Sequence, residues 1–162
     1  MNELTDVAEQ IAAKLIARKE TIAVAESCTG GLLGGRITDV PGSSDVFLGG
    51  VVAYDNSVKE TLLGVPGALL QAHGAVSEPV ASAMASGVRA RLGAGVGVGI
   101  TGIAGPGGGT PEKPVGTVCI AVADAAGTRA RTSRMLGSRP EIRARAVQAA
   151  LYMVRQGLLA GS

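Results

Sequence analysis

The segment ESCTGG, residues 26–31, places a hydroxyl and a thiol next to each other where a short apolar run gives way to a helical pattern. The first N–H groups of a helix lack intrahelical partners, and with the helix dipole they can stabilise an oxyanion or hold a phosphate. Gly30 and Gly31 would let a ligand approach the backbone closely. The same residues equally suit a plain helix cap and turn, and composition alone balances the two interpretations. Ser27 is therefore a candidate nucleophile with candidate anion donors beside it.

A second candidate follows the next apolar run, where Tyr54 and Lys59 stand five residues apart. Across a strand end and a helix start, these two side chains could converge on one point. A lysine acts as a base only when burial or a neighbouring cation lowers its pKa, and a lone lysine is usually solvated. If Ser27 is a nucleophile, Lys59 is its better activator, by analogy with serine–lysine enzymes. The one histidine, His73, occurs in a turn-like context that favours capping, and Cys28 is a rival nucleophile more simply interpreted as a small buried hydrophobe.

Two further segments carry binding chemistry. The glycine-rich segment 101–109 follows an apolar run, and ligands collect at such loops in open α/β sheets. Its glycine spacing fits neither a Walker loop nor a dinucleotide-binding fingerprint. Arg139 and Arg143 lie at the start of the last helical pattern, where a guanidinium can grip a phosphate bidentately. We expect most other arginines of this region to be solvated.

Alternating helical patterns and short apolar runs must position these candidates. Apolar residues at helical spacing, with capping and breaking residues, predict helices over residues 4–17, 30–39, 57–63, 77–91 and 140–159. Short apolar runs predict strands over 21–26, 47–55, 95–103, 115–124 and 128–136, the last two joined by a hairpin turn at Ala126-Gly127. This order predicts an α/β layered fold with a mixed sheet, in a single domain over residues 1–162.

Composition argues against several classes of partner. The 162 residues include 15 basic and 13 acidic side chains, a balance that disfavours nucleic acid, and three aromatics offer no platform for stacking bases. One histidine and two cysteines furnish no familiar metal set. The charged N-terminus is no signal peptide, and no apolar run reaches the about 20 residues that a membrane helix needs. We expect a cytoplasmic protein without membrane, nucleic-acid or metal partners, and its Ala-rich helices favour a homo-oligomer.

Six segments together resemble the C-terminal domain of the CinA family, the nicotinamide-nucleotide amidohydrolases. They are AESCTGG (25–31), PGSSDVF (41–47), AYDNSVK (53–59), HGAVSEPV (73–80), TGIAGPGGG (101–109) and EKPVGTV (112–118). They follow the family's order and cover nearly the whole chain. Some members carry a further N-terminal domain related to molybdopterin-binding proteins, and we expect this chain to be the stand-alone form.

The resemblance implies a three-layer α/β/α sandwich that deamidates nicotinamide mononucleotide to nicotinate mononucleotide and ammonia, without a metal or organic cofactor. It assigns the nucleophile to Ser27 and its activation to Lys59 and Tyr54. The substrate-binding residues expected around them are Glu26, Cys28, Thr29, Gly30, Gly31, Ser44, Thr101, Gly102, Gly105 and Arg143. Two alternatives stay open. One is a nucleotide-binding or regulatory module without turnover, and the other an interaction protein in competence or DNA-damage responses.

Overall fold

A five-stranded sheet in the order β2-β1-β3-β4-β5 forms the centre of the computed structural model, which describes residues 3–160. Its strands are β1 Ile22–Glu26, β2 Phe47–Val52, β3 Val96–Gly102, β4 Thr117–Asp124 and β5 Gly127–Arg134. β1 runs parallel to β2 and β3, whereas β4 is antiparallel to β3 and β5. The predicted mixed sheet is confirmed.

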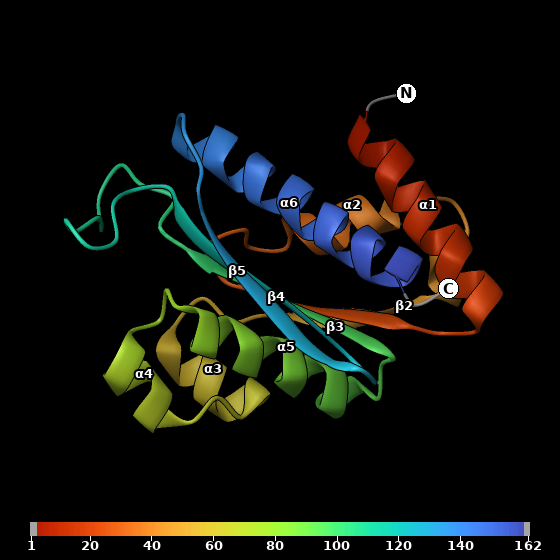
Figure 1. Cartoon of the computed structure of the whole chain (residues 1–162), viewed down its shortest axis with the longest axis horizontal. Helices are drawn as coiled ribbons and strands as arrows, with labels where there is room; N and C mark the ends of the chain where they lie inside the picture. Colours follow the sequence, from red (N-terminus) through yellow and green to blue (C-terminus); the bar gives the residue numbers. More distant parts are fainter. Residues whose placement is uncertain (1–2, 161–162) are drawn as a thin grey trace.

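Helices cover both faces of this sheet and produce the predicted three-layer α/β/α arrangement (Figure 1). One face carries α1 Glu3–Arg18, α2 Leu32–Thr38 and α6 Arg139–Ala160. The other carries α3 Asn56–Leu63, α4 Gly67–His73 and α5 Glu78–Leu92. A short 3-10 turn, η1 Ser43–Asp45, precedes β2. None of the described helices combines the length and apolarity needed to cross a bilayer.

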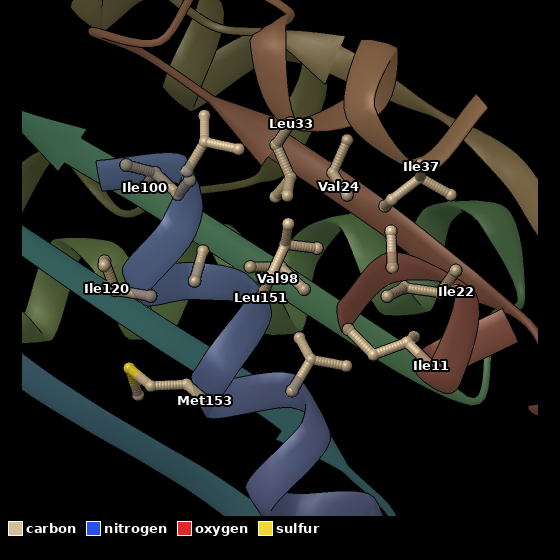
Figure 2. Packing of buried hydrophobic residues seen from close by; sticks show 14 of the residues in the cluster. Ile11, Ile22, Val24, Leu33, Ile37, Val98, Ile100, Ile120, Leu151 and Met153 are labelled. Carbon is tan, nitrogen blue, oxygen red and sulfur yellow. The ribbon is translucent and has the colours of Figure 1, made fainter. Parts of the chain in front are cut away.

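The two faces of the sheet are packed differently. Figure 2 shows branched side chains of β1, β3 and β4 meeting those of α1, α2 and α6, with Val24 opposite Leu33. On the other face β3 presents glycine: a Cβ on Gly97 would collide with the Ala85 carbonyl oxygen of α5. A helix can approach a strand this closely only where side chains are missing. The high glycine and alanine content thus lets α5 lie directly on the sheet.

Two of the boundaries that shift do so for a local reason. The helix expected from residue 30 begins at Leu32, because Gly30 and Gly31 have φ of +57° and +108°. The strand expected over 47–55 ends at Val52, and Asp55 instead caps α3 by accepting the Ser57 N–H at 3.0 Å.

The hairpin turn is displaced by one residue from the predicted position. Asp124 pairs with Gly127, so the turn residues are Ala125 and Ala126 rather than Ala126 and Gly127. The Asp124 carboxylate accepts the Ala126 N–H at 2.8 Å, and Gly127 supplies a φ of +136°. Of the predicted domain 1–162, residues 1, 2, 161 and 162 lie outside the described part of the chain.

Candidate active site

Ser27 follows β1 directly and lies at the carboxyl end of the parallel strands. Its N–H donates to the Ile100 carbonyl at 2.9 Å, which continues the pairing of β1 with β3 past the last strand residue. Its carbonyl then accepts the Gly30 N–H at 3.1 Å and closes a tight turn. Only 8% of Ser27 is exposed. The nucleophile turn, residues 27–31, is therefore held by backbone bonds at both ends.

Lys59 reaches this turn from α3 and is 1% exposed. Its Nζ lies 3.2 Å from Ser27 Oγ, 2.9 Å from the Ala53 carbonyl oxygen and 3.0 Å from the Tyr54 carbonyl oxygen. Burial of the ammonium lowers the Lys59 pKa, against the opposing effect of the Asp55 carboxylate. A neutral amine can donate to both carbonyls and still accept the Ser27 hydroxyl proton. The geometry therefore suits a lysine acting as the base of a serine nucleophile.

The Tyr54 side chain lies apart from this pair. The residue is 61% exposed, and its hydroxyl accepts a hydrogen bond from Arg139 at 3.2 Å. Tyr54 meets Lys59 through its main-chain carbonyl. The expected convergence of the two side chains is therefore wrong, because β2 ends at Val52 and the chain turns Tyr54 toward α6.

Two arginines from the first turns of α6 border the nucleophile turn. Arg143 donates from Nε to the Cys28 carbonyl at 3.1 Å and from Nη2 to the Thr29 carbonyl at 3.2 Å. Arg139 donates to the Gly105 carbonyl at 2.8 Å and so joins the glycine-rich loop to Tyr54. The sequence offered both arginines as phosphate-binding candidates, and the resemblance implied Arg143 alone; the spacing of four residues places both on one helix face.

Cys28 is buried beneath the turn and does not compete with Ser27 as a nucleophile. It is 5% exposed, and burial raises the pKa of its thiol to about 11. A thiol with that pKa is protonated near neutral pH and is unreactive. Gly102 makes room for it, since a Cβ there would lie 3.1 Å from the Cys28 sulfur. The interpretation of Cys28 as a small buried hydrophobe agrees with this geometry.

Glu26 and Thr29 point into the protein rather than toward a ligand. Glu26 is 2% exposed and Thr29 is fully buried. The Thr29 hydroxyl donates to Glu26 Oε1 at 2.6 Å, and the Leu33 and Gly34 N–H groups donate to the same carboxylate at 2.9 and 3.0 Å. The free N–H groups expected at the start of α2 are thus already occupied by Glu26.

Thr101 and Gly105 support the site from the neighbouring strand and loop. The Thr101 hydroxyl is buried and donates to the Ala75 carbonyl at 3.0 Å, so it orients the segment before α5. Gly105 adopts a φ of +78°, and a Cβ there would collide with the Val115 side chain. Both residues shape the backbone around the turn.

Ser44 does not join this cluster within one chain. It is exposed in η1, ahead of β2, where the Ile22 N–H donates to the Val46 carbonyl at 2.8 Å. That contact places η1 beside the start of β1, whereas Ser27 follows its end. Because β1 and β2 are parallel, Ser44 lies at the amino ends of these strands and Ser27 at their carboxyl ends.

Two further observations concern metal binding and a cavity distant from the pair. In the described part of the chain, no three His, Cys, Asp or Glu side chains gather closely enough to hold a metal ion. A cavity of about 690 Å³ lies at the other end of the sheet, beside the β4–β5 turn and the end of α6. Its lining includes Arg18, Asp124 and Gly157 but neither Ser27 nor Lys59.

Comparison with known sequences places nearly all of the described chain in one family. A family model described as the CinA C-terminal domain matches residues 4–158. A CinA-like protein of Gemmatimonas aurantiaca is 58% identical over 151 residues, which cover 93% of this chain and 35% of that protein. A CinA-like protein of an Anaeromyxobacter species is 55% identical over 153 residues, covering 94% of this chain and 38% of that protein. The chain therefore spans little more than a third of these curated relatives.

Solved structures agree with the sequences. A competence/damage-inducible protein from Agrobacterium tumefaciens matches with a TM-score of 0.93 at 40% identity, covering 98% of this chain and 96% of that one. A CinA superfamily protein from Klebsiella pneumoniae matches with a TM-score of 0.94 at 30% identity, covering 98% and 99%. Both the motif resemblance and the fold class are thus confirmed, and the chain belongs to the CinA C-terminal domain family.

Proposed function

We propose that this domain hydrolyses the carboxamide of nicotinamide mononucleotide to nicotinate mononucleotide and ammonia. The observation that carries the proposal is the contact of 3.2 Å between Ser27 Oγ and the Nζ of a lysine that is 1% exposed. A lysine is rarely buried without a carboxylate partner. A buried amine with a lowered pKa, aimed at a serine hydroxyl, is the arrangement that a serine–lysine amidase requires.

The reaction proceeds in two steps through an acyl-enzyme. Neutral Lys59 takes the Ser27 proton as Oγ attacks the carboxamide carbon, and the resulting ammonium gives that proton to the amide nitrogen, which leaves as ammonia when the C–N bond breaks. Water then attacks the ester, with Lys59 again as base, and releases the carboxylate with Ser27 restored. The positive charge of the pyridinium ring already makes the amide carbon electrophilic, so a moderately activated serine suffices.

The oxyanion donors come from the nucleophile turn rather than from α2. Glu26 occupies the Leu33 and Gly34 N–H groups. Among residues 3–160, the N–H groups of Cys28 and Thr29 donate to no other residue. These two donors immediately follow the nucleophile, which is where a developing oxyanion needs them.

The arginines of α6 supply the phosphate contacts in this proposal. A guanidinium carries five N–H donors, and both Arg139 and Arg143 keep donors beyond those used on the protein. The exposed ring of Tyr54 adds an aromatic face at the same rim. A pyridine nucleotide could lie with its amide at Ser27 and its phosphate at these guanidinium groups.

A second candidate is a regulatory module that binds the nucleotide without turnover. The observation that favours it is the description of the structural relatives as competence or damage-inducible proteins. Such a module would keep the arginines, and would have no need of the Ser27–Lys59 contact.

The test is a metal-free assay of the purified protein. Nicotinamide mononucleotide is incubated with it in the presence of EDTA, and both ammonia and nicotinate mononucleotide are measured. We expect turnover by the wild type that Ser27→Ala and Lys59→Ala abolish, while the control Lys14→Ala on α1 retains it. Full activity in Ser27→Ala would refute the mechanism. Binding of the nucleotide without turnover by a folded wild type would favour the regulatory module.

A further inference from the structure

Glu26 is a buried carboxylate that the proposed mechanism does not use. It ends β1, and strand alternation places it on the same face as Ile22 and Val24, which pack beneath α2 (Figure 2). Only 2% of the residue is exposed, and no ion pair involving it occurs within residues 3–160. A charge in such a place needs strong local compensation. Hydrogen-bond donors of the protein must therefore compensate the Glu26 carboxylate.

Three donors supply that compensation, and all come from the chain that follows Ser27. Oε1 accepts the Thr29 hydroxyl at 2.6 Å and the Leu33 N–H at 2.9 Å, and Oε2 accepts the Gly34 N–H at 3.0 Å. Hydrogen bonds to a charged acceptor are shorter and stronger than neutral ones. The three hydrogen bonds to Glu26 connect the end of β1 to the middle of the nucleophile turn and to the first turn of α2.

Besides its backbone hydrogen bonds, the turn depends on side-chain contacts for its shape. Gly30 and Gly31 adopt φ of +57° and +108°, and glycine accepts many other backbone conformations. Arg143 holds the outer side of the turn through the Cys28 and Thr29 carbonyls, and Glu26 holds the inner side. Both the carbonyl and the hydroxyl of Thr29 are therefore hydrogen-bonded, to Arg143 and to Glu26 respectively.

We infer that Glu26 is a positioning residue. It keeps Ser27 Oγ and the Cys28 and Thr29 N–H groups in the positions relative to Lys59 that the reaction requires. This role rests on the proposed serine–lysine function. It replaces the expectation that Glu26 contacts substrate, because the residue is 2% exposed and its carboxylate accepts hydrogen bonds from Thr29, Leu33 and Gly34. Glutamine is the informative substitution. It keeps the size of the side chain, but its NH₂ group must face at least one of the three donors.

The experiment combines substrate turnover with direct labelling of Ser27. A fluorophosphonate probe reports the reactivity of the serine by intact mass, whether or not the substrate is correct. Folding of each variant is checked by circular dichroism and thermal melting, with assays run well below the melting temperature. The variants are Glu26→Gln, Thr29→Val, Thr29→Ser and the control Glu78→Gln, a glutamate at the start of α5 that also accepts a threonine hydroxyl.

We expect folded Glu26→Gln to lose about 10- to 100-fold in both kcat and labelling rate with KM nearly unchanged, since small misplacements of a reacting group have effects of this size. Thr29→Val should show a smaller loss of kcat and labelling rate, and Thr29→Ser should recover that loss. Glu78→Gln should match the wild type in both quantities. Thr29→Val also provides the test if Glu26→Gln does not fold.

Wild-type kcat and labelling in folded Glu26→Gln would overturn the inference and leave Glu26 with a role in stability alone. A raised KM with unchanged labelling would also overturn it, in favour of substrate contact. If the wild type is labelled at Ser27 but does not hydrolyse nicotinamide mononucleotide, the proposed function fails while the labelling series still decides the role of Glu26. A wild type that is not labelled at Ser27 refutes both.

Discussion

Replacement of Lys59 by methionine tests the electrostatic basis of the site through the pH dependence of stability. Methionine has a similar length and no titratable group. The structure places the Lys59 ammonium in a buried site, and burial lowers its pKa below the value of 10.5 for an exposed lysine. Between the lowered pKa and about 10.5, the unfolded chain binds more protons than the folded one. The free energy of unfolding of the wild type must therefore rise with pH in that window.

The magnitude follows from one proton. The slope reaches at most about 1.4 kcal/mol per pH unit, and each unit by which the pKa is lowered costs the same amount below the window. Lys59→Met lacks this contribution. It also leaves the Ala53 and Tyr54 carbonyls without their donor, which costs about 1–3 kcal/mol per buried group but does not vary with pH. The difference between the two proteins therefore isolates the titration of Lys59.

The assay is urea unfolding of both proteins at several values from pH 7 to 10.5. We expect the stability of the wild type to rise relative to that of Lys59→Met as the pH increases, and kcat of the wild type to rise through the same lowered pKa. A constant difference in stability over the whole range would show that Lys59 titrates like an exposed lysine. That result would refute the argument for a neutral base at Ser27.

Three other predictions concern single residues. Gly99→Ala should destabilise the protein by about 1–3 kcal/mol or more in urea unfolding, because its Cβ would meet the Ala81 carbonyl of α5. Gly107→Ala, which faces open space, should be nearly neutral, and equal effects would contradict the close packing. Arg143→Lys should lower kcat/KM about tenfold or more in steady-state assays, since an ammonium cannot reproduce two fixed guanidinium bonds; unchanged kinetics would exclude this role. Cys28 should resist iodoacetamide at pH 8 and react only as the pH approaches about 11, and rapid alkylation at pH 8 by a folded sample would contradict its burial.

Local patterns were sufficient for much of the architecture. Short apolar runs predicted each strand of the sheet, and Ser77 caps α5 where the helix over 77–91 was expected to begin. These features depend on interactions within a few residues, which the sequence displays directly. The hairpin shows the limit of that information. Its turn lies one residue away from the predicted position, and there the Asp124 carboxylate accepts the Ala126 N–H.

The sequence by itself determined which residues could do chemistry, and the tertiary structure decided which of them meet. Ser27 and Lys59 are 32 positions apart and come together because β2 lies parallel to β1 and delivers α3 to the same edge of the sheet. The same pairing sends Ser44 to the opposite edge. Glu26 turned inward because strand alternation put it under α2, whose N–H groups it then occupied. Such outcomes depend on strand order and helix placement, which arise from packing between distant segments and leave no local trace.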